Sequence, residues 1–204
     1  MDRPLVHLLP HWNFQGREGE LIRVFAYTNC EELELYLNGE SLGRQKIERF
    51  GHGEWMVPYR PGKLTVEGRD GGKTLCRDSR ETTGEAKHLK LRLENKVAAN
   101  GRDMAVITCY CTDAEGREVP TASPEVAFFT NGLGRVVGTG SDITDHRPVF
   151  LPDRKMRAGR ITAAIQVGTE IGELKVYAQS PGLTDACLTI LLGKERSSKE
   201  RNFE

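Results

Sequence analysis

Apolar and polar residues alternate along short runs of this chain, and tight turns separate the runs. Leu33, Leu35 and Leu37 alternate with Glu34 and Tyr36 just before an Asn-Gly turn. Successive side chains of a β-strand point to opposite faces, so this alternation gives one apolar face and one wet face. No segment of the sequence keeps the 3.6-residue periodicity of an amphipathic helix over three turns. The pattern therefore predicts an all-β fold.

Runs of this kind recur along the chain and fall into two sets. The first set of predicted strands is Leu21–Tyr27, Leu33–Leu37, Trp55–Tyr59, Lys63–Gly68 and Lys73–Asp78. The second set is Leu89–Leu93, Met104–Thr112, Glu125–Thr130, Arg135–Gly138, Arg160–Val167, Glu173–Gln179 and Ala186–Leu192. Between the sets, Ser79–Lys87 is polar and aperiodic, and we interpret it as a linker.

The length of 204 residues fits two modules of roughly 100 residues, each large enough to bury its own core. We predict two tandem β-sandwiches, the first over residues 1–84 and the second over residues 85–193. Residues 194–204 are rich in charge, and we predict that they form a disordered tail.

The charge and hydropathy of the chain indicate which partners to expect. Lys and Arg together number 29, as do Asp and Glu, so the formal net charge is zero. A chain without excess positive charge releases few counterions from a phosphate backbone, so we expect no nucleic-acid partner. No apolar run reaches the roughly 18 residues of a membrane span, and the first residues lack the apolar stretch of a signal peptide. We therefore expect a soluble chain with no membrane partner. The cellular compartment is not predicted, because a chain that begins in mid-protein would have left any export signal behind.

Five cysteines are too few and too irregularly spaced for a disulfide framework or a Cys-x-x-Cys metal site. They are Cys30, Cys76, Cys109, Cys111 and Cys187. Cys109 and Cys111 are expected on the same face of one strand, where a bond between them would distort the strand. We interpret the five as buried, inert thiols, with one cross-sheet disulfide or a metal or redox role as the alternatives.

Catalytic and ligand-binding motifs are sparse. The five histidines are scattered, and no pair has the i, i+4 spacing of a helical zinc site. The glycines from Gly132 to Gly140 lead into loop residues rather than a helix N-terminus, so we interpret them as turn and bulge glycines. Asp142, Asp145 and His146 form the densest polar cluster, interpreted as a solvated loop with an Asx-turn at Asp142, a bound cation being the alternative. We predict no catalytic residue, no metal site and no cofactor.

The two tryptophans are the candidate contact residues for carbohydrate or for another domain, because sugar rings stack on exposed aromatic faces. Trp12 precedes the first predicted strand and is interpreted as packing or as an anchor against a preceding domain. Trp55 starts a predicted strand and is interpreted as core or sheet surface. A sugar platform is the alternative for both.

Two groups of residues carry a resemblance to a known family. In the first half the matching runs are Pro10–Phe14, Gly19–Val24, Tyr27–Cys30 and Leu33–Gly43. In the second half they are Asp113–Arg117, Val119–Pro120, Asn131–Gly140, Ala158–Gly159 and Tyr177–Leu183. The first group resembles the module that follows the barrel in glycoside hydrolase family two enzymes of the β-galactosidase type. The second group is similar to the last immunoglobulin-like module of the same enzymes. One departure is Phe14, where the family pattern has a second tryptophan.

The resemblance implies two tandem immunoglobulin-like β-sandwiches at the C-terminus of a glycosidase, with the catalytic barrel of the parent chain as partner. The parent is expected to remove a terminal sugar, galactose for this type, by a retaining two-carboxylate mechanism, and to be periplasmic or secreted in a bacterium. The family's catalytic glutamates belong to the barrel and match nothing here. Two alternatives remain: a carbohydrate-binding module that holds polysaccharide, and an interaction or adhesion segment of a surface protein.

Overall fold

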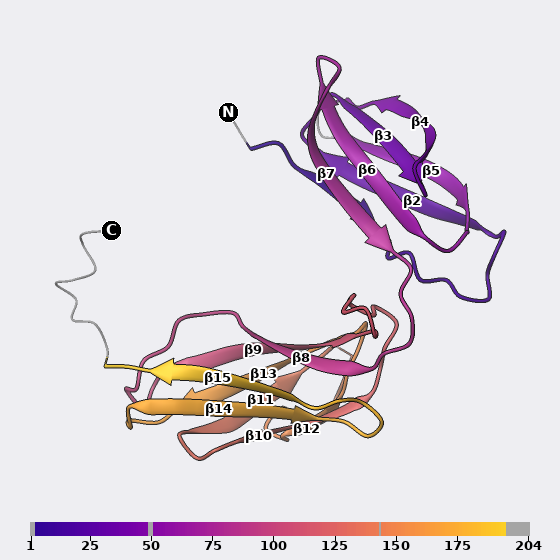
Figure 1. The fold of residues 1–204 in the computed structure, drawn as a ribbon. Coiled ribbons are helices and arrows are strands. Elements are labelled where there is room, and N and C mark those ends of the chain that lie inside the picture. Colours follow the sequence, from indigo (N-terminus) through magenta and orange to yellow (C-terminus); the bar gives the residue numbers. More distant parts are fainter. Residues whose placement is uncertain (1–2, 49–50, 143, 195–204) are drawn as a thin grey trace. The chain divides into compact units, whose positions relative to one another are not determined.

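The computed structural model describes residues 3–48, 51–142 and 144–194. The chain divides into two compact units, Met1–Thr82 and Thr83–Glu204, each with its own hydrophobic core (Figure 1). Within the described ranges all regular structure is strand, and no helix is long and apolar enough to cross a membrane. The prediction of an all-β chain of two tandem sandwiches is confirmed. The predicted disordered tail, residues 194–204, lies outside the described residues beyond Lys194.

The first unit is a sandwich of two antiparallel sheets. One sheet has the order β1-β2-β5 and consists of β1 (Val6–Leu9), β2 (Leu21–Thr28) and β5 (His52–Pro58). The other has the order β4-β3-β6-β7 and consists of β3 (Glu32–Leu37), β4 (Glu40–Lys46), β6 (Lys63–Asp70) and β7 (Lys73–Glu81). The alternating leucines Leu33, Leu35 and Leu37 all point into the core, as the sequence pattern requires.

Two strands of this unit were not predicted, and both are edge strands. The strand β4 pairs only with β3, and most of its side chains are exposed, so it has no apolar alternation to detect. The strand β1 is four residues long and pairs only with β2. The predicted linker also begins too early, because Ser79–Glu81 extend β7 along β6. An edge strand that faces water is held by backbone hydrogen bonds to one neighbour and does not require apolar side chains. Its sequence therefore lacks the alternation that would predict a strand.

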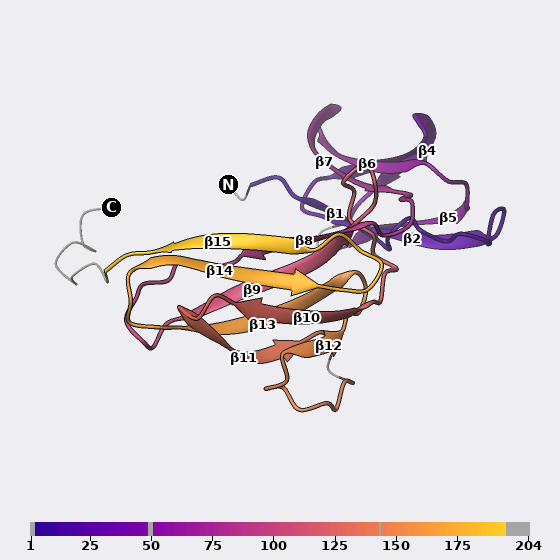
Figure 2. The same cartoon turned by 60° about the horizontal axis from the view of Figure 1, so that its bottom comes forward.

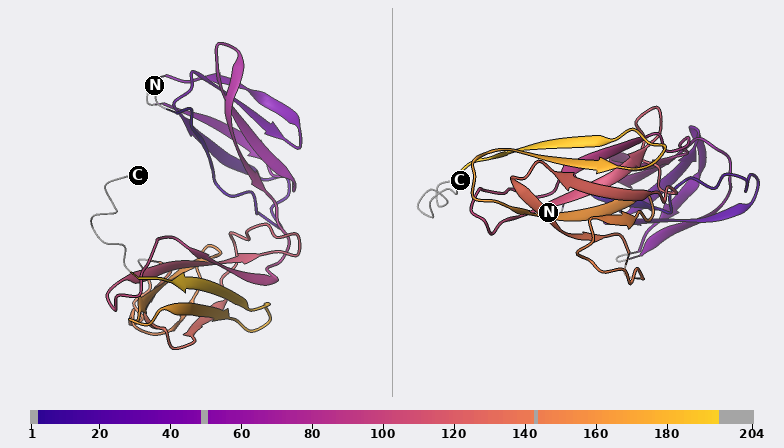
Figure 3. Two further views of the ribbon diagram at one scale, coloured as in Figure 1. Left: turned by 60° about the vertical axis from the view of Figure 1, so that its left-hand side comes forward. Right: turned by 90° about the horizontal axis from the view of Figure 1, so that it is seen from below.

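The second unit has two four-stranded antiparallel sheets. The first has the order β11-β13-β9-β8 and consists of β8 (His88–Leu93), β9 (Met104–Thr112), β11 (Gly134–Gly140) and β13 (Arg160–Val167). The second has the order β12-β10-β14-β15 and consists of β10 (Glu125–Thr130), β12 (Asp153–Lys155), β14 (Gly172–Gln179) and β15 (Ala186–Leu192). The strands of both sheets run close to a common direction (Figure 3), as in aligned sandwich packing.

The cysteines are unpaired in the structure and differ in environment. Cys109 and Cys111 lie on the same inward face of β9, where burial raises the pKa of Cys109 to about 12 and that of Cys111 to about 11. These two thiols fit the interpretation of buried, inert groups. Cys187 does not, because it lies on the exposed face of the edge strand β15.

Candidate functional site

Trp12 is a core residue of the first unit. Its indole is fully buried, and its ring packs against Tyr59 at a centroid distance of 5.2 Å and against Phe14 at 6.1 Å. The indole Nε1 donates a hydrogen bond to the carbonyl of Arg60, and the carbonyl of Trp12 accepts one from the hydroxyl of Thr82. Neither ring face is exposed for a sugar or for a preceding domain. Its role in this unit is packing, which ties the segment after β1 to the end of β7.

Trp55 lies on the inward face of β5 and is 8% exposed. Its ring covers Gly53, two positions earlier on the same face, where a Cβ atom would lie 2.5 Å from the ring. The glycine therefore makes room for the indole to lie flat within the core. The structure places Trp55 among the core positions, and no sugar platform is formed there.

The outward face of the β1-β2-β5 sheet is the candidate interaction site. It carries Leu9 from β1, Leu21 and Tyr27 from β2 and Met56 from β5, which are 39%, 58%, 48% and 54% exposed. The imidazole of His52 lies between two aromatic rings of β2, 5.4 Å from the ring centre of Tyr27 and 5.6 Å from that of Phe25. We call this surface the exposed apolar face.

This face was missed in the sequence because its residues occupy the positions expected to face water. The register pairs His7 with Tyr27, and Tyr27 with His52, so the three side chains form one row across the sheet. The guanidinium of Arg23 lies 4.9 Å from the ring centre of Phe25. Arg23 is ion-paired with Glu54 of β5, and both lie on this face between Leu21 and Tyr27, so exposed apolar side chains flank a charged pair. Exposed apolar side chains grouped on one face are typical of a protein contact or a ligand-binding surface.

A polar groove lies on the outward face of the other sheet of the same unit. It has a volume of about 410 Å³, and its lining includes Tyr36, Thr65, Glu67, Arg77 and Ser79. Beside it, Glu34 on β3 lies directly opposite Glu67 on β6. Both carboxylates contact the same Nη1 atom of Arg69, at 3.2 Å and 2.8 Å. The fold therefore brings two acids together, which the sequence alone did not predict.

The state of these two carboxylates does not suit acid–base chemistry. Burial alone would raise the pKa of Glu34, but hydrogen bonds from Tyr36, Ser41 and Arg44 outweigh burial and hold the pKa below its usual value. Burial would likewise raise the pKa of Glu67, and its bonds from Thr74 and Arg77 again lower it. A general acid of a glycosidase needs a raised pKa, so both groups have the opposite character.

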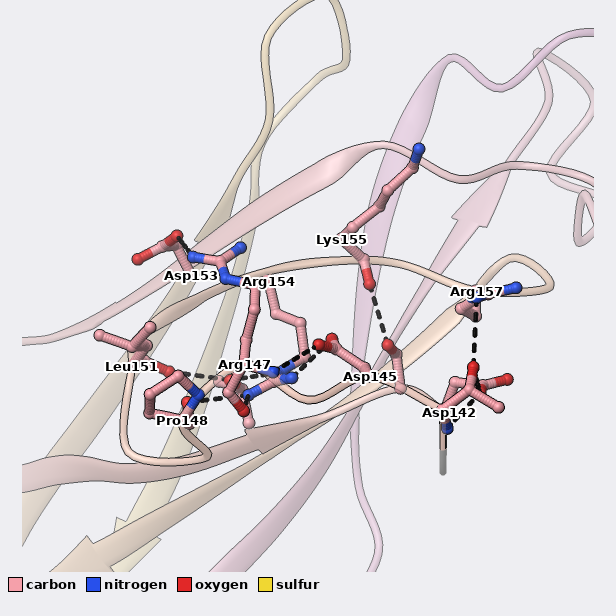
Figure 4. A network of polar contacts seen from close by, with 12 residues as sticks. Asp142, Asp145, Arg147, Pro148, Leu151, Asp153, Arg154, Lys155 and Arg157 are labelled. Carbon is pink, nitrogen blue, oxygen red and sulfur yellow. Dashed lines mark hydrogen bonds and ion pairs between the residues drawn. The ribbon is translucent and has the colours of Figure 1, made fainter.

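In the second unit, a buried arginine holds the connection between β11 and β12 (Figure 4). Arg154 is 1% exposed, because its position on β12 pairs with Val126 and points inward. Its guanidinium forms an ion pair with Asp145 at 2.5 Å and donates to the hydroxyl of Thr139 and to the carbonyls of Arg147 and Pro148. The loop extends beyond the strands in Figure 2, and Arg154 fixes its backbone.

The cluster of Asp142, Asp145 and His146 is part of this loop. Asp142 accepts hydrogen bonds from both the backbone N–H and the hydroxyl of Thr144, so the predicted Asx-turn is confirmed. Asp145 accepts the N–H of Arg147 and is paired with Arg154, and these bonds lower its pKa. Among the described residues, no group of three or more His, Cys, Asp or Glu side chains is arranged to hold a metal ion. Both carboxylates are bonded within the loop.

The fold defines a class of protein: tandem β-sandwich modules, each with its own core. Residues 89–189 match the family described as glycoside hydrolase family 2 C-terminal domain 5, and residues 19–76 match a domain of unknown function, DUF4982. Beta-galactosidase BoGH2A of Bacteroides ovatus is 31% identical over 93% of this chain and 22% of its own length. A beta-glucuronidase of Formosa agariphila is 28% identical over 92% of this chain and 19% of its own length.

The fold comparison agrees with the family matches. A beta-glycosidase structure from Bacteroides vulgatus superposes with a TM-score of 0.89 and 32% identity, over 94% of this chain and 25% of that chain. The chain thus spans about a fifth of the length of the curated relatives it matches. It belongs to the C-terminal accessory modules of glycoside hydrolase family 2 enzymes, and its described residues include no part of a catalytic barrel.

Proposed function

We propose that this chain is a non-catalytic accessory segment that supports the catalytic barrel of a glycosidase. The observation that carries the proposal is its match, along nearly all of its length, to about a fifth of each relative. The lowered pKa values of Glu34 and Glu67 support a non-catalytic role, because both acids are neutralised by arginines. The parent enzyme is proposed to remove a terminal β-galactosyl group, with a β-glucuronosyl group as the alternative that the second relative's name suggests.

The exposed apolar face is the proposed contact with the barrel. It belongs to the unit that, by its family likeness, follows the barrel in the chain, and most of the parent's length lies outside this segment. Water contact with Leu21, Tyr27 and Met56 costs free energy that burial against another domain would remove. A lysine at Tyr27 or Met56 would place a charge in that contact.

Activity assays test the non-catalytic role. The isolated chain is expected to give no turnover of a chromogenic β-galactoside or β-glucuronide above buffer. Turnover that survives purification and disappears in Glu67→Gln would contradict the proposal.

Substitution in the parent enzyme tests the contact. Tyr27→Lys and Met56→Lys are expected to leave the melting temperature of the isolated chain nearly unchanged, since both side chains are already exposed. In the full-length parent they should lower the melting temperature of the barrel or its activity. The matched control is Thr65→Lys, on the outward face of the other sheet of the same unit. An effect of all three substitutions alike would refute a specific contact at the exposed apolar face.

A second function, carbohydrate binding, is favoured by one observation: Tyr27, His52 and Phe25 together offer aromatic surface on the outward face of one sheet. Affinity electrophoresis in a galactose-containing polysaccharide separates the two functions. A binding module migrates more slowly, and Tyr27→Ala restores normal migration. A support module migrates at the same rate with and without the polysaccharide.

A further inference from the structure

The side chains of two cysteines of the first unit, Cys30 and Cys76, approach each other beside Gly68. Cys30 lies in the short connection between β2 and β3 and is 5% exposed, while Cys76 lies on β7 and is half-buried. Their Sγ atoms are 3.7 Å apart. A disulfide needs a separation of about 2.05 Å, so a small rotation of either side chain would be enough to bring the sulfurs into bonding distance.

Gly68 makes this meeting possible. It is the β6 residue that pairs with Cys76 on β7, and a Cβ atom at this position would lie 2.7 Å from the Sγ of Cys76 and 2.9 Å from that of Cys30. Any other residue would occupy the space where the two sulfurs approach each other. Three chain segments, the β2–β3 connection, β6 and β7, therefore leave room for a sulfur–sulfur bond.

We propose that Cys30 and Cys76 form an intradomain disulfide when the chain meets a low-molecular-weight disulfide such as oxidised glutathione. The thiolate of Cys76, the more accessible of the two, attacks one sulfur of that disulfide, forms a mixed disulfide and releases one thiol. The thiolate of Cys30 then attacks the Sγ of Cys76 and releases the second thiol. The two protein protons go to the two released thiols, and the small disulfide is the electron acceptor.

The bond would join the β2–β3 connection to the edge strand β7, which ends the unit. The cross-linked residues are 46 positions apart in the chain. Closing a loop of that length restricts the unfolded chain and stabilises the folded unit. Burial and the neighbouring Cys30 raise the pKa of Cys76 to about 11, so oxidation should be slow at neutral pH and faster as the pH rises.

Peptide mapping under non-reducing conditions tests the bond. After incubation of the full chain with oxidised glutathione at mildly alkaline pH, we expect one linked peptide pair that contains Cys30 and Cys76. The thermal midpoint followed by tryptophan fluorescence should rise by roughly 10 °C and return on reduction with dithiothreitol. Both tryptophans lie in this unit, so the signal reports it alone.

Three variants make the test specific. Cys76→Ser should lose both the linked peptide and the rise in midpoint, whereas Cys187→Ser, at the exposed cysteine of the second unit, should keep both. Gly68→Ala retains both thiols but places a methyl group between them, so the yield of linked peptide should fall at least about tenfold. Glutathione retained on Cys76 without a linked pair, a linked pair of other cysteines, or an unchanged midpoint in oxidised wild type would overturn the proposal.

Discussion

Replacing Arg154 with methionine tests whether this one buried charge holds the β11–β12 loop in place. Methionine keeps most of the apolar stem, so the packing against the sandwich core changes little. The substitution removes the ion pair with Asp145 and the hydrogen bonds to Thr139 and to the carbonyls of Arg147 and Pro148. The carbonyls of Arg147 and Pro148 then lose the bonds that hold the loop backbone to Arg154.

The expected loss follows from these contacts. Three hydrogen bonds to neutral groups are worth about 1 kcal/mol each, which gives about 3 kcal/mol. Removing one partner of a buried ion pair costs about 3–5 kcal/mol, and Asp145 retains contact with water at 17% exposure, so we expect the lower end. The two contributions add up to about 6 kcal/mol, which in a unit of this size corresponds to a decrease in midpoint of roughly 25 °C.

The two units can be followed separately, because both tryptophans lie in the first unit and none in the second. Far-ultraviolet circular dichroism reports both units, and tryptophan fluorescence reports the first. Arg154→Met should shift a transition seen by dichroism and leave the fluorescence transition unchanged. The matched control, Lys155→Met, removes an exposed cation at the next position of β12 and should change neither. If the two variants lose the same stability to within about 0.5 kcal/mol, the clamp role of Arg154 is refuted.

Three further predictions concern polar and backbone features of the second unit. Asp113 accepts the N–H groups of Gly84 and Arg117 as well as the Arg117 guanidinium; although its burial acts the other way, these bonds lower its pKa to about 2. As the pH falls, Asp113 is protonated in the unfolded chain before it is protonated in the folded unit, so its contribution to the stability of the unit is present above about pH 4 and lost toward pH 2. Asp113→Asn should make the melting temperature followed by dichroism fall less steeply over this pH range. Equal slopes of melting temperature against pH for the variant and the wild type would contradict the prediction. Gly159→Ala should cost about 3 kcal/mol or more in urea unfolding, because φ is +71° and the new Cβ would lie 2.2 Å from the carbonyl oxygen of Val119. Ala158→Gly should instead stabilise the unit by up to about 1 kcal/mol, since Ala158 has a φ of 48°, and a loss of stability there would contradict the strain argument.

The alternation of side chains was sufficient to predict the strands whose faces separate core from water. The run Leu33–Leu37 is an example, because burial of its leucines fixes both the strand and its register. The strands β1 and β4 were missed because they lie at sheet edges, where pairing rather than alternation defines the strand. The end of β7 was missed for the same reason: Ser79–Glu81 pair with β6 but show no apolar pattern.

The sites were harder to predict, because they depend on which residues meet across strands. Arg154 stands between Asp153 and Lys155 and has the sequence context of a solvated residue, yet its inward register buries it. Tryptophan is the residue most expected at a sugar platform, but the two tryptophans fill the core and Tyr27 occupies the exposed apolar face instead. Neither outcome can be read from spacing, since both depend on the pairing of strands that are distant in sequence.

Four carboxylates of this chain share one property that bears on its role. The carboxylates of Glu34, Glu67, Asp113 and Asp145 each accept several hydrogen bonds, and the pKa of each is lowered. A carboxylate that must donate a proton or attack an anomeric carbon needs a free oxygen and, for the acid, a raised pKa. Acids that are fully engaged with arginines and backbone N–H groups fix loops and sheet surfaces. This pattern supports an accessory role and directs attention to the exposed apolar face, where Leu21, Tyr27 and Met56 remain open to water within the unit.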